Sequence, residues 1–161
     1  AQLLNDICAI DGDFTVSFMT SHPKDLTDDV IAAVAKQDKI EKYIHLPAQS
    51  GNDRILKLMN RKYTRQHYLE IIKKIRASIP NCRITSDFIV GFPTETEEEF
   101  NDTLSLVKEV RFDSIFAFMY SPRTGTVASN MEGQIPEKIK RQRVNKLLAL
   151  EKLVQKEDNK R

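Results

Sequence analysis

The stretch Cys82–Glu99 constrains the fold most, because it has the pattern of a buried strand that passes through a short loop into a helix. Residues 84–90 are rich in β-branched and aromatic side chains, which favour a strand. Gly91 has no Cβ, so the backbone can turn there or approach a ligand closely. Thr96 and Glu99 have the spacing of a helix capping box. Such strand–loop–helix junctions form ligand sites in α/β proteins.

The same order of strand, loop and helix recurs along the chain. Strands are expected at residues 14–18, 43–46, 84–90 and 114–120, each followed by a helical pattern. A spacing of about 30–40 residues is typical of βα units wound right-handed around a parallel sheet. About four units are too few to close an eight-stranded barrel. We therefore predict an α/β fold that forms a partial (β/α) TIM-like barrel.

Composition excludes few classes of function. The chain has 161 residues and a net charge of +2, which neither requires nor excludes a nucleic-acid partner. No apolar run approaches the roughly 20 residues that span a bilayer, and no signal peptide is evident, so a cytoplasmic protein without membrane contact is expected. Cys8 and Cys82 lie far apart and lack partners at metal-ligand spacing, so we expect two buried thiols and no metal site.

Loops at the carboxyl ends of parallel strands share one rim, and here they carry mostly neutral polar groups and bare backbone. This set suits a ribose, an adenine edge and an amino-acid head group better than hydrolysis, since no catalytic triad order or carboxylate pair is evident. The rim residues are Thr20, Ser21 and His22, then Gln49, Ser50 and Gly51, then Gly91, Pro93 and Thr94, then Tyr120, Ser121 and Arg123.

Several of these patterns also have purely structural interpretations. Residues 49–51 could be a turn in which Ser50 caps the next helix. Asp87 lies within an apolar strand and needs a partner, either a ligand or a hydrogen-bond network. The basic residues of 138–146 are expected to form a solvated helix surface. A second basic group either forms another solvated face or holds phosphates, and it comprises Arg54, Arg61, Lys62 and Arg65.

Five segments resemble, in order and spacing, successive segments of the radical S-adenosylmethionine (SAM) methylthiotransferases. They are Ser21–Leu26, His45–Gly51, Met59–Thr64, Asp87–Thr96 and Tyr120–Arg123. Together they cover nearly the whole chain, and the similarity is greatest to the MiaB-type branch that modifies tRNA. Sister enzymes that modify a ribosomal protein or a different tRNA adenosine remain alternatives.

The resemblance implies that residues 1–161 form roughly the last four βα units of a six-stranded radical SAM barrel. It also implies a reaction for the full-length enzyme. One 4Fe–4S cluster cleaves SAM to a 5′-deoxyadenosyl radical, which abstracts hydrogen from C2 of isopentenylated adenosine 37 in the tRNA anticodon loop. A second 4Fe–4S cluster then delivers a methylated sulfur.

The same resemblance implies which residues form the site. Those beside the SAM ribose or methionine are Gln49, Ser50 and Gly51. Those that shape and close the adenine site are Asp87, Val90, Gly91, Pro93, Tyr120 and Ser121. Candidates for the substrate side are Arg61, Lys62 and Arg123.

The family's Cys-x3-Cys-x2-Cys motif is absent from these residues, as are a second cluster domain and an RNA-binding β-domain. We therefore expect this fragment to bind no cluster and to be inactive alone. Its strand at Phe14–Met19 would have an unpaired edge that favours an edge-strand dimer.

Two alternatives use the same residues differently. A phosphate- or aldehyde-handling barrel enzyme would need a lysine or paired acids on the rim. A non-catalytic RNA-binding module would use residues 54–65 and the last helix.

Overall fold

A parallel three-stranded sheet forms the centre of the molecule, in a computed structural model that describes residues 1–19 and 22–158. The strands are β1 (Tyr43–His45), β2 (Arg83–Val90) and β3 (Ser114–Met119), and they lie in the order β1-β2-β3. Both pairings are parallel. The predicted α/β class and its parallel sheet are confirmed.

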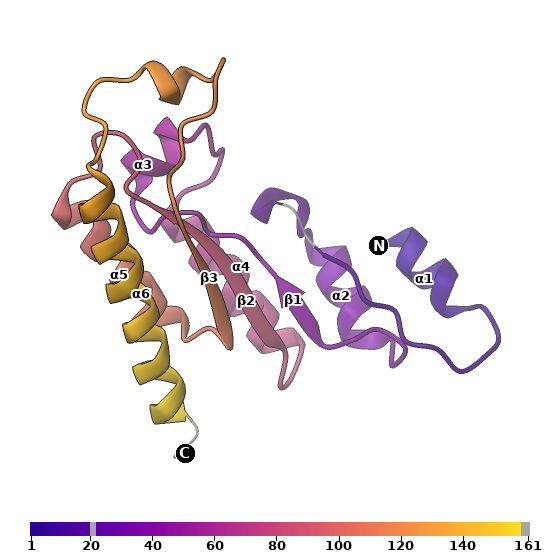
Figure 1. Ribbon diagram of the computed structural model, residues 1–161. Coiled ribbons are helices and arrows are strands. Elements are labelled where there is room, and N and C mark those ends of the chain that lie inside the picture. Colours follow the sequence, from indigo (N-terminus) through magenta and orange to yellow (C-terminus); the bar gives the residue numbers. More distant parts are fainter. Residues whose placement is uncertain (20–21, 159–161) are drawn as a thin grey trace.

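Helices precede, connect and follow the strands, and in Figure 1 α4 lies behind the sheet while α5 and α6 lie beside β3. Two short 3-10 helices are η1 (Pro23–Asp25) and η2 (Val127–Asn130). The α-helices are α1 (Gln2–Cys8), α2 (Asp28–Lys36), α3 (Asp53–Leu58), α4 (Arg65–Ser78), α5 (Glu97–Val110) and α6 (Glu137–Asp158).

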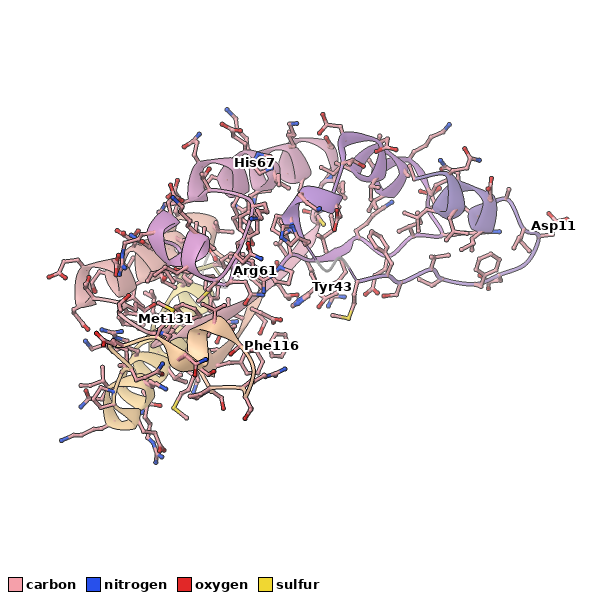
Figure 2. The ribbon with its side chains drawn as sticks, turned by 90° about the horizontal axis from the view of Figure 1, so that it is seen from above. Asp11, Tyr43, Arg61, His67, Phe116 and Met131 are labelled. Carbon is pink, nitrogen blue, oxygen red and sulfur yellow. The ribbon has the colours of Figure 1, made fainter. Side chains whose placement is uncertain are left out.

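In the part of the chain that the structure describes, helices cover one face of the sheet and leave the other open. On β2 the alternate residues Ile84, Ser86, Phe88 and Val90 are all buried on the covered face. On the opposite face, Phe116 and Phe118 of β3 are 50% and 52% exposed. Figure 2 shows Phe116 on the side of the sheet away from His67 of α4. The open face is therefore free to line a site.

The first expected strand, at residues 14–18, is wrong as a strand. Among the described residues, this segment forms one parallel bridge, between Val16 and Ile40. The Val16 N–H donates to the Lys39 carbonyl at 2.7 Å, and the Val16 carbonyl accepts from Glu41 N at 2.9 Å. Thr15 and Ser17 are exposed, so little burial supports a longer ladder. The neighbouring Thr20 and Ser21 lie outside the described residues.

One helix start follows the local sequence and another departs from it. Thr96 and Glu99 form the predicted capping box of α5. The predicted Ser50 cap of α3 is wrong, because the Asn52 side chain accepts from the N–H groups of Arg54 and Ile55 instead. The Ser50 hydroxyl is engaged elsewhere, since it accepts from Asn52 N at 3.2 Å.

Candidate functional site

A cavity of about 870 Å³ opens at the carboxyl ends of the strands. This volume lies within the range of small-molecule sites, roughly 300–1,000 Å³. Its wall combines the ends of β2 and β3, the end of α3 and the chain that follows β3. The lining residues are Gln49, Leu58, Met59, Asn60, Arg61, Asp87, Ile89, Phe92, Phe118, Met119, Tyr120, Ser121, Arg123, Thr126 and Ala128.

The structure brings part of the predicted site together at this cavity. Six predicted residues line it: Gln49, Arg61, Asp87, Tyr120, Ser121 and Arg123. The others lie outside the lining that the described residues form. Lys62 is exposed, whereas the buried ones are Ser50, Gly51, Val90, Gly91 and Pro93. The buried residues therefore support the wall rather than form its surface.

Gln49 reaches the cavity from an uncommon backbone conformation. Its φ is +65°, in the left-handed region that non-glycine residues seldom adopt. Two hydrogen bonds hold it there: Gln49 N donates to the Asp87 carbonyl at 2.8 Å, and Ile89 N donates to the Gln49 carbonyl at 2.9 Å. Strained positions of this kind concentrate at functional sites, so the conformation marks Gln49 as a candidate ligand contact.

Two buried tyrosines fix the loop that leads to Gln49. The Tyr63 hydroxyl donates to the carbonyls of Pro47 at 3.3 Å and Ala48 at 3.1 Å. The Tyr68 hydroxyl donates to the Leu46 carbonyl at 2.7 Å. Burial raises the pKa of Tyr63 to about 12, so its hydroxyl stays a neutral donor. A buried tyrosine usually needs a hydrogen-bond partner for its hydroxyl, and the Leu46 carbonyl provides one for Tyr68.

Asp87 belongs to a polar network on the otherwise apolar open face. Its Oδ2 lies 3.4 Å from Nε2 of His45, a buried residue of β1. The His45 Nδ1 lies 2.9 Å from the Thr85 hydroxyl. The Asp87 side chain is nevertheless 30% exposed, so the carboxylate can also accept a hydrogen bond from a ligand in the cavity.

Two buried polar atoms in the cavity wall have no hydrogen-bond partner among the described residues. They are the Tyr120 hydroxyl and Nε of Arg61. Leaving such groups unsatisfied costs free energy, and a polar ligand would remove that cost. The Tyr120 ring packs edge-on against Phe92 with centroids 5.0 Å apart, which provides an apolar surface beside the free hydroxyl. This combination suits a nucleoside.

Two of the four residues in the second basic group, Arg54 and Arg65, are held by α5 rather than directed at the cavity. Arg54 Nε donates to Glu99 Oε1 at 2.5 Å. Arg65 Nη1 donates to the Asp102 carbonyl at 2.7 Å, and its Nη2 donates to Glu109 at 2.8 Å. Arg54 and Arg65 therefore tie α3 and α4 to α5.

Gly51 has a packing role that explains its residue type. Its N–H donates to the Thr103 hydroxyl of α5 at 2.9 Å. A Cβ on Gly51 would lie 2.5 Å from the Asp102 carbonyl oxygen, too close for any other residue without movement. Only glycine lets this loop approach α5 so closely.

The described residues do not provide an iron–sulfur site. Within residues 1–19 and 22–158, no group of three or more His, Cys, Asp and Glu side chains could hold a metal ion. Cys8 is buried and Cys82 is half-buried, and both are free thiols. Iron–sulfur clusters need several cysteine thiolates, so these two residues do not fit such a group. In the same part of the chain, no helix is long and apolar enough to cross a membrane.

Two of the known proteins that are similar to this chain carry the same name. The chain is 52% identical over 160 residues to a tRNA-2-methylthio-N(6)-dimethylallyladenosine synthase from Carboxydothermus hydrogenoformans, covering 99% of this chain and 36% of that protein. It is 57% identical over 148 residues to the Clostridium botulinum protein of the same name, covering 92% of this chain and 33% of that protein. This chain thus spans about a third of the length of these relatives.

A solved structure supports the fold. The coproporphyrinogen III oxidase HemN from Escherichia coli, a radical SAM enzyme, matches with a TM-score of 0.73 at 19% identity. The match covers 95% of this chain and 36% of HemN. The model of the radical SAM superfamily matches residues 1–107. With the family model, the relatives and the fold in agreement, the chain belongs to the radical SAM superfamily.

Proposed function

We propose that this chain is the SAM-binding part of a tRNA methylthiotransferase that modifies C2 of isopentenylated adenosine. The observation that carries the proposal is the identity of 52–57% to tRNA-2-methylthio-N(6)-dimethylallyladenosine synthases along 92–99% of the chain. Because the relatives are about three times longer, the activity is assigned to a longer cytoplasmic protein that contains residues 1–161 as part of its barrel domain.

The cavity supports a role in holding the nucleoside of SAM. Asp87 offers a carboxylate to the ribose hydroxyls, and Gln49 offers an amide to the same end of the ligand. The Tyr120 hydroxyl can satisfy its missing hydrogen bond on the adenine or on the amino-acid end. Ile89, Phe92 and Phe118 provide an apolar surface for the adenine ring.

SAM bound beside a reduced iron–sulfur cluster supplies the radical that starts the family's reaction. The two cysteines described above do not fit a cluster, so its ligands are assigned to the rest of the longer protein. The role proposed for this chain is to bind and orient SAM. Five buried residues would support that role by holding the lining residues in place, and they are Ser50, Gly51, Val90, Gly91 and Pro93.

The substrate side of the cavity is proposed to bind the tRNA anticodon loop. Arg61 and Arg123 line the cavity, and Lys62 is exposed beside Arg61. Cationic side chains around an opening neutralise phosphate groups and so set the position of a nucleic acid without reading its sequence.

The test is to express the longer protein in a bacterium that lacks its own enzyme and to measure methylthiolated adenosine in digested tRNA by mass spectrometry. We expect the modification to appear. Asp87→Asn and Gln49→Ala should each reduce it at least tenfold, which corresponds to a rise of about 1.4 kcal/mol in the activation free energy. Gln66→Ala, on an exposed part of α4, is the matched control and should have no effect. A methylthiolated ribosomal protein with unmodified tRNA would contradict the proposal.

We also propose that two copies of this fragment pair through residues 14–18. Val16 uses both of its backbone groups toward residues 39–41, which leaves the exposed residues Thr15 and Ser17 on the outer side. Such an edge favours pairing with another chain. Light scattering of the fragment should give a dimer, and Ser17→Pro should give a monomer. A wild-type monomer at high concentration would contradict this proposal.

A further inference from the structure

Two basic side chains of α6 are buried. Lys140 is 8% exposed and Arg143 is 5% exposed, although both lie in a helix segment that was expected to be solvated. A buried cation is costly unless it is paired or hydrogen-bonded. The contacts of these two side chains therefore indicate what they do.

Lys140 crosses the end of β2 and reaches the end of β3. Its aliphatic stem lies against Gly91, where an added Cβ would be 2.4 Å from Lys140 Cγ. Its ammonium donates to the Tyr120 carbonyl at 2.9 Å and lies 5.2 Å from the centroid of the Tyr120 ring. Gly91 has φ +71°, so both its conformation and its missing side chain make room for this stem.

Both backbone polar groups of Tyr120 are hydrogen-bonded. Its N–H donates to the Val90 carbonyl of β2 at 2.9 Å, and its carbonyl accepts from Lys140. Its ring contacts Phe92, and its hydroxyl is one of the two unsatisfied polar groups in the cavity wall. The direction of this hydroxyl therefore depends on the backbone that Lys140 fixes.

Arg143 is bound to a different segment. Its Nη1 donates to Glu95 Oε2 at 2.7 Å and to the Glu95 carbonyl at 3.1 Å. Glu95 Oε2 also accepts from Gly91 N at 2.7 Å. Arg143 thus anchors the loop after β2, whereas Lys140 alone of the two contacts Tyr120.

We propose that Lys140 is a positioning residue, which aims the Tyr120 hydroxyl at the ligand through its backbone carbonyl and ring. This inference rests on the proposed SAM-binding function of the cavity. Helix α6 contributes no lining residue to the cavity. Through Lys140, however, it would set the direction of the Tyr120 hydroxyl, which is one of the polar groups that face the ligand.

The first experiment tests the position of Tyr120 without any ligand. The chain contains 4 tyrosines, so labelling with 3-fluorotyrosine gives a ¹⁹F spectrum in which Tyr120→Phe assigns one signal. Lys140→Met keeps an aliphatic stem over Gly91 and removes the ammonium. We expect the Tyr120 signal to shift or broaden while those of Tyr63 and Tyr68 stay unchanged. The control is Lys138→Met, at an exposed position of α6, which should leave all signals unchanged.

An unchanged Tyr120 signal in Lys140→Met would overturn the inference, whatever happens to SAM binding. Changes at all four tyrosines would also overturn it, because they would indicate a general loss of packing.

The second experiment measures SAM affinity of the longer, cluster-loaded protein by equilibrium dialysis. Loss of a hydrogen bond from a charged group predicts an affinity about tenfold weaker for Lys140→Met and unchanged for Lys138→Met. Equal affinities for Lys140→Met and the wild type would overturn the inference. Failure of the wild type to bind SAM would instead contradict the proposed function, and the ¹⁹F result would still decide whether Lys140 positions Tyr120.

Discussion

Replacing Arg143 by methionine should strongly destabilise the fold, because it removes one partner of a buried ion pair. The Arg143 Nη1 and Glu95 Oε2 atoms are 2.7 Å apart, and the side chains are 6% and 0% exposed. Breaking such a pair leaves an uncompensated charge and typically costs about 3–5 kcal/mol. This is a large part of the roughly 5–15 kcal/mol that stabilises a domain.

The assay is urea unfolding followed by circular dichroism at pH 7. With a urea dependence of about 2 kcal/mol per molar, the midpoint of Arg143→Met should fall by about 2 M. Glu95→Gln and the double variant complete a double-mutant cycle. The double variant should be more stable than the sum of the single changes predicts, since it leaves no unpaired carboxylate.

The loss should also depend on pH. Burial raises the pKa of Glu95, while the Gly91 N–H and the Arg143 guanidinium oppose that rise. Without the guanidinium the pKa of Glu95 rises further, so the folded variant takes up a proton more readily than the unfolded chain. The deficit of Arg143→Met should therefore shrink as the pH falls from 7 toward 4.5. A cost below about 1 kcal/mol at pH 7, or no coupling to Glu95, would refute this reasoning.

Three further changes test the supports of the site. Gly51→Ala places a Cβ 2.5 Å from the Asp102 carbonyl oxygen and should lower the unfolding free energy by about 2 kcal/mol in urea titrations, whereas an unchanged value would contradict the packing described. Tyr63→Phe removes a hydroxyl from two loop carbonyls and should cost about 1–2 kcal/mol, measured as a lower thermal midpoint; a higher midpoint would argue against this support. Glu99→Gln weakens the capping box and should cost about 1 kcal/mol at pH 7. The Arg54 hydrogen bond lowers the pKa of Glu99 below 4.5, so this cost should be present above pH 4.5 and disappear as the pH falls below that pKa; a cost that persists in acid would contradict the assignment.

The parts that local sequence determines were predictable. β2 and the capping box of α5 follow from residues adjacent in the chain, and both are present. Asp87 and Tyr120 reach the cavity because residues near the ends of parallel strands share one edge. Membership of the radical SAM superfamily is confirmed by the family model, and the sequence pointed to it because five motifs in the right order are more specific than any one of them.

The missing parts depend on long-range contacts. The segment at residues 14–18 alternates like a strand, yet a ladder also needs a neighbour of matching length and burial. Lys140 and Arg143 lie in a stretch of charged residues that is typical of a solvated helix face. They are buried because α6 packs against the strand ends, and this packing cannot be read from the local sequence. The positive φ of Gln49 could not be predicted from its residue type, because it results from the pairing of Gln49 with β2.

The central claim is that the cavity at the strand ends holds SAM. Hydrogen–deuterium exchange of the longer, cluster-loaded protein with and without SAM tests it most directly. Peptides covering residues 46–50, 87–92 and 118–123 should exchange more slowly when SAM is bound, while the outer helix α4 should be unaffected. Protection confined to other segments, with these three unchanged, would contradict the account.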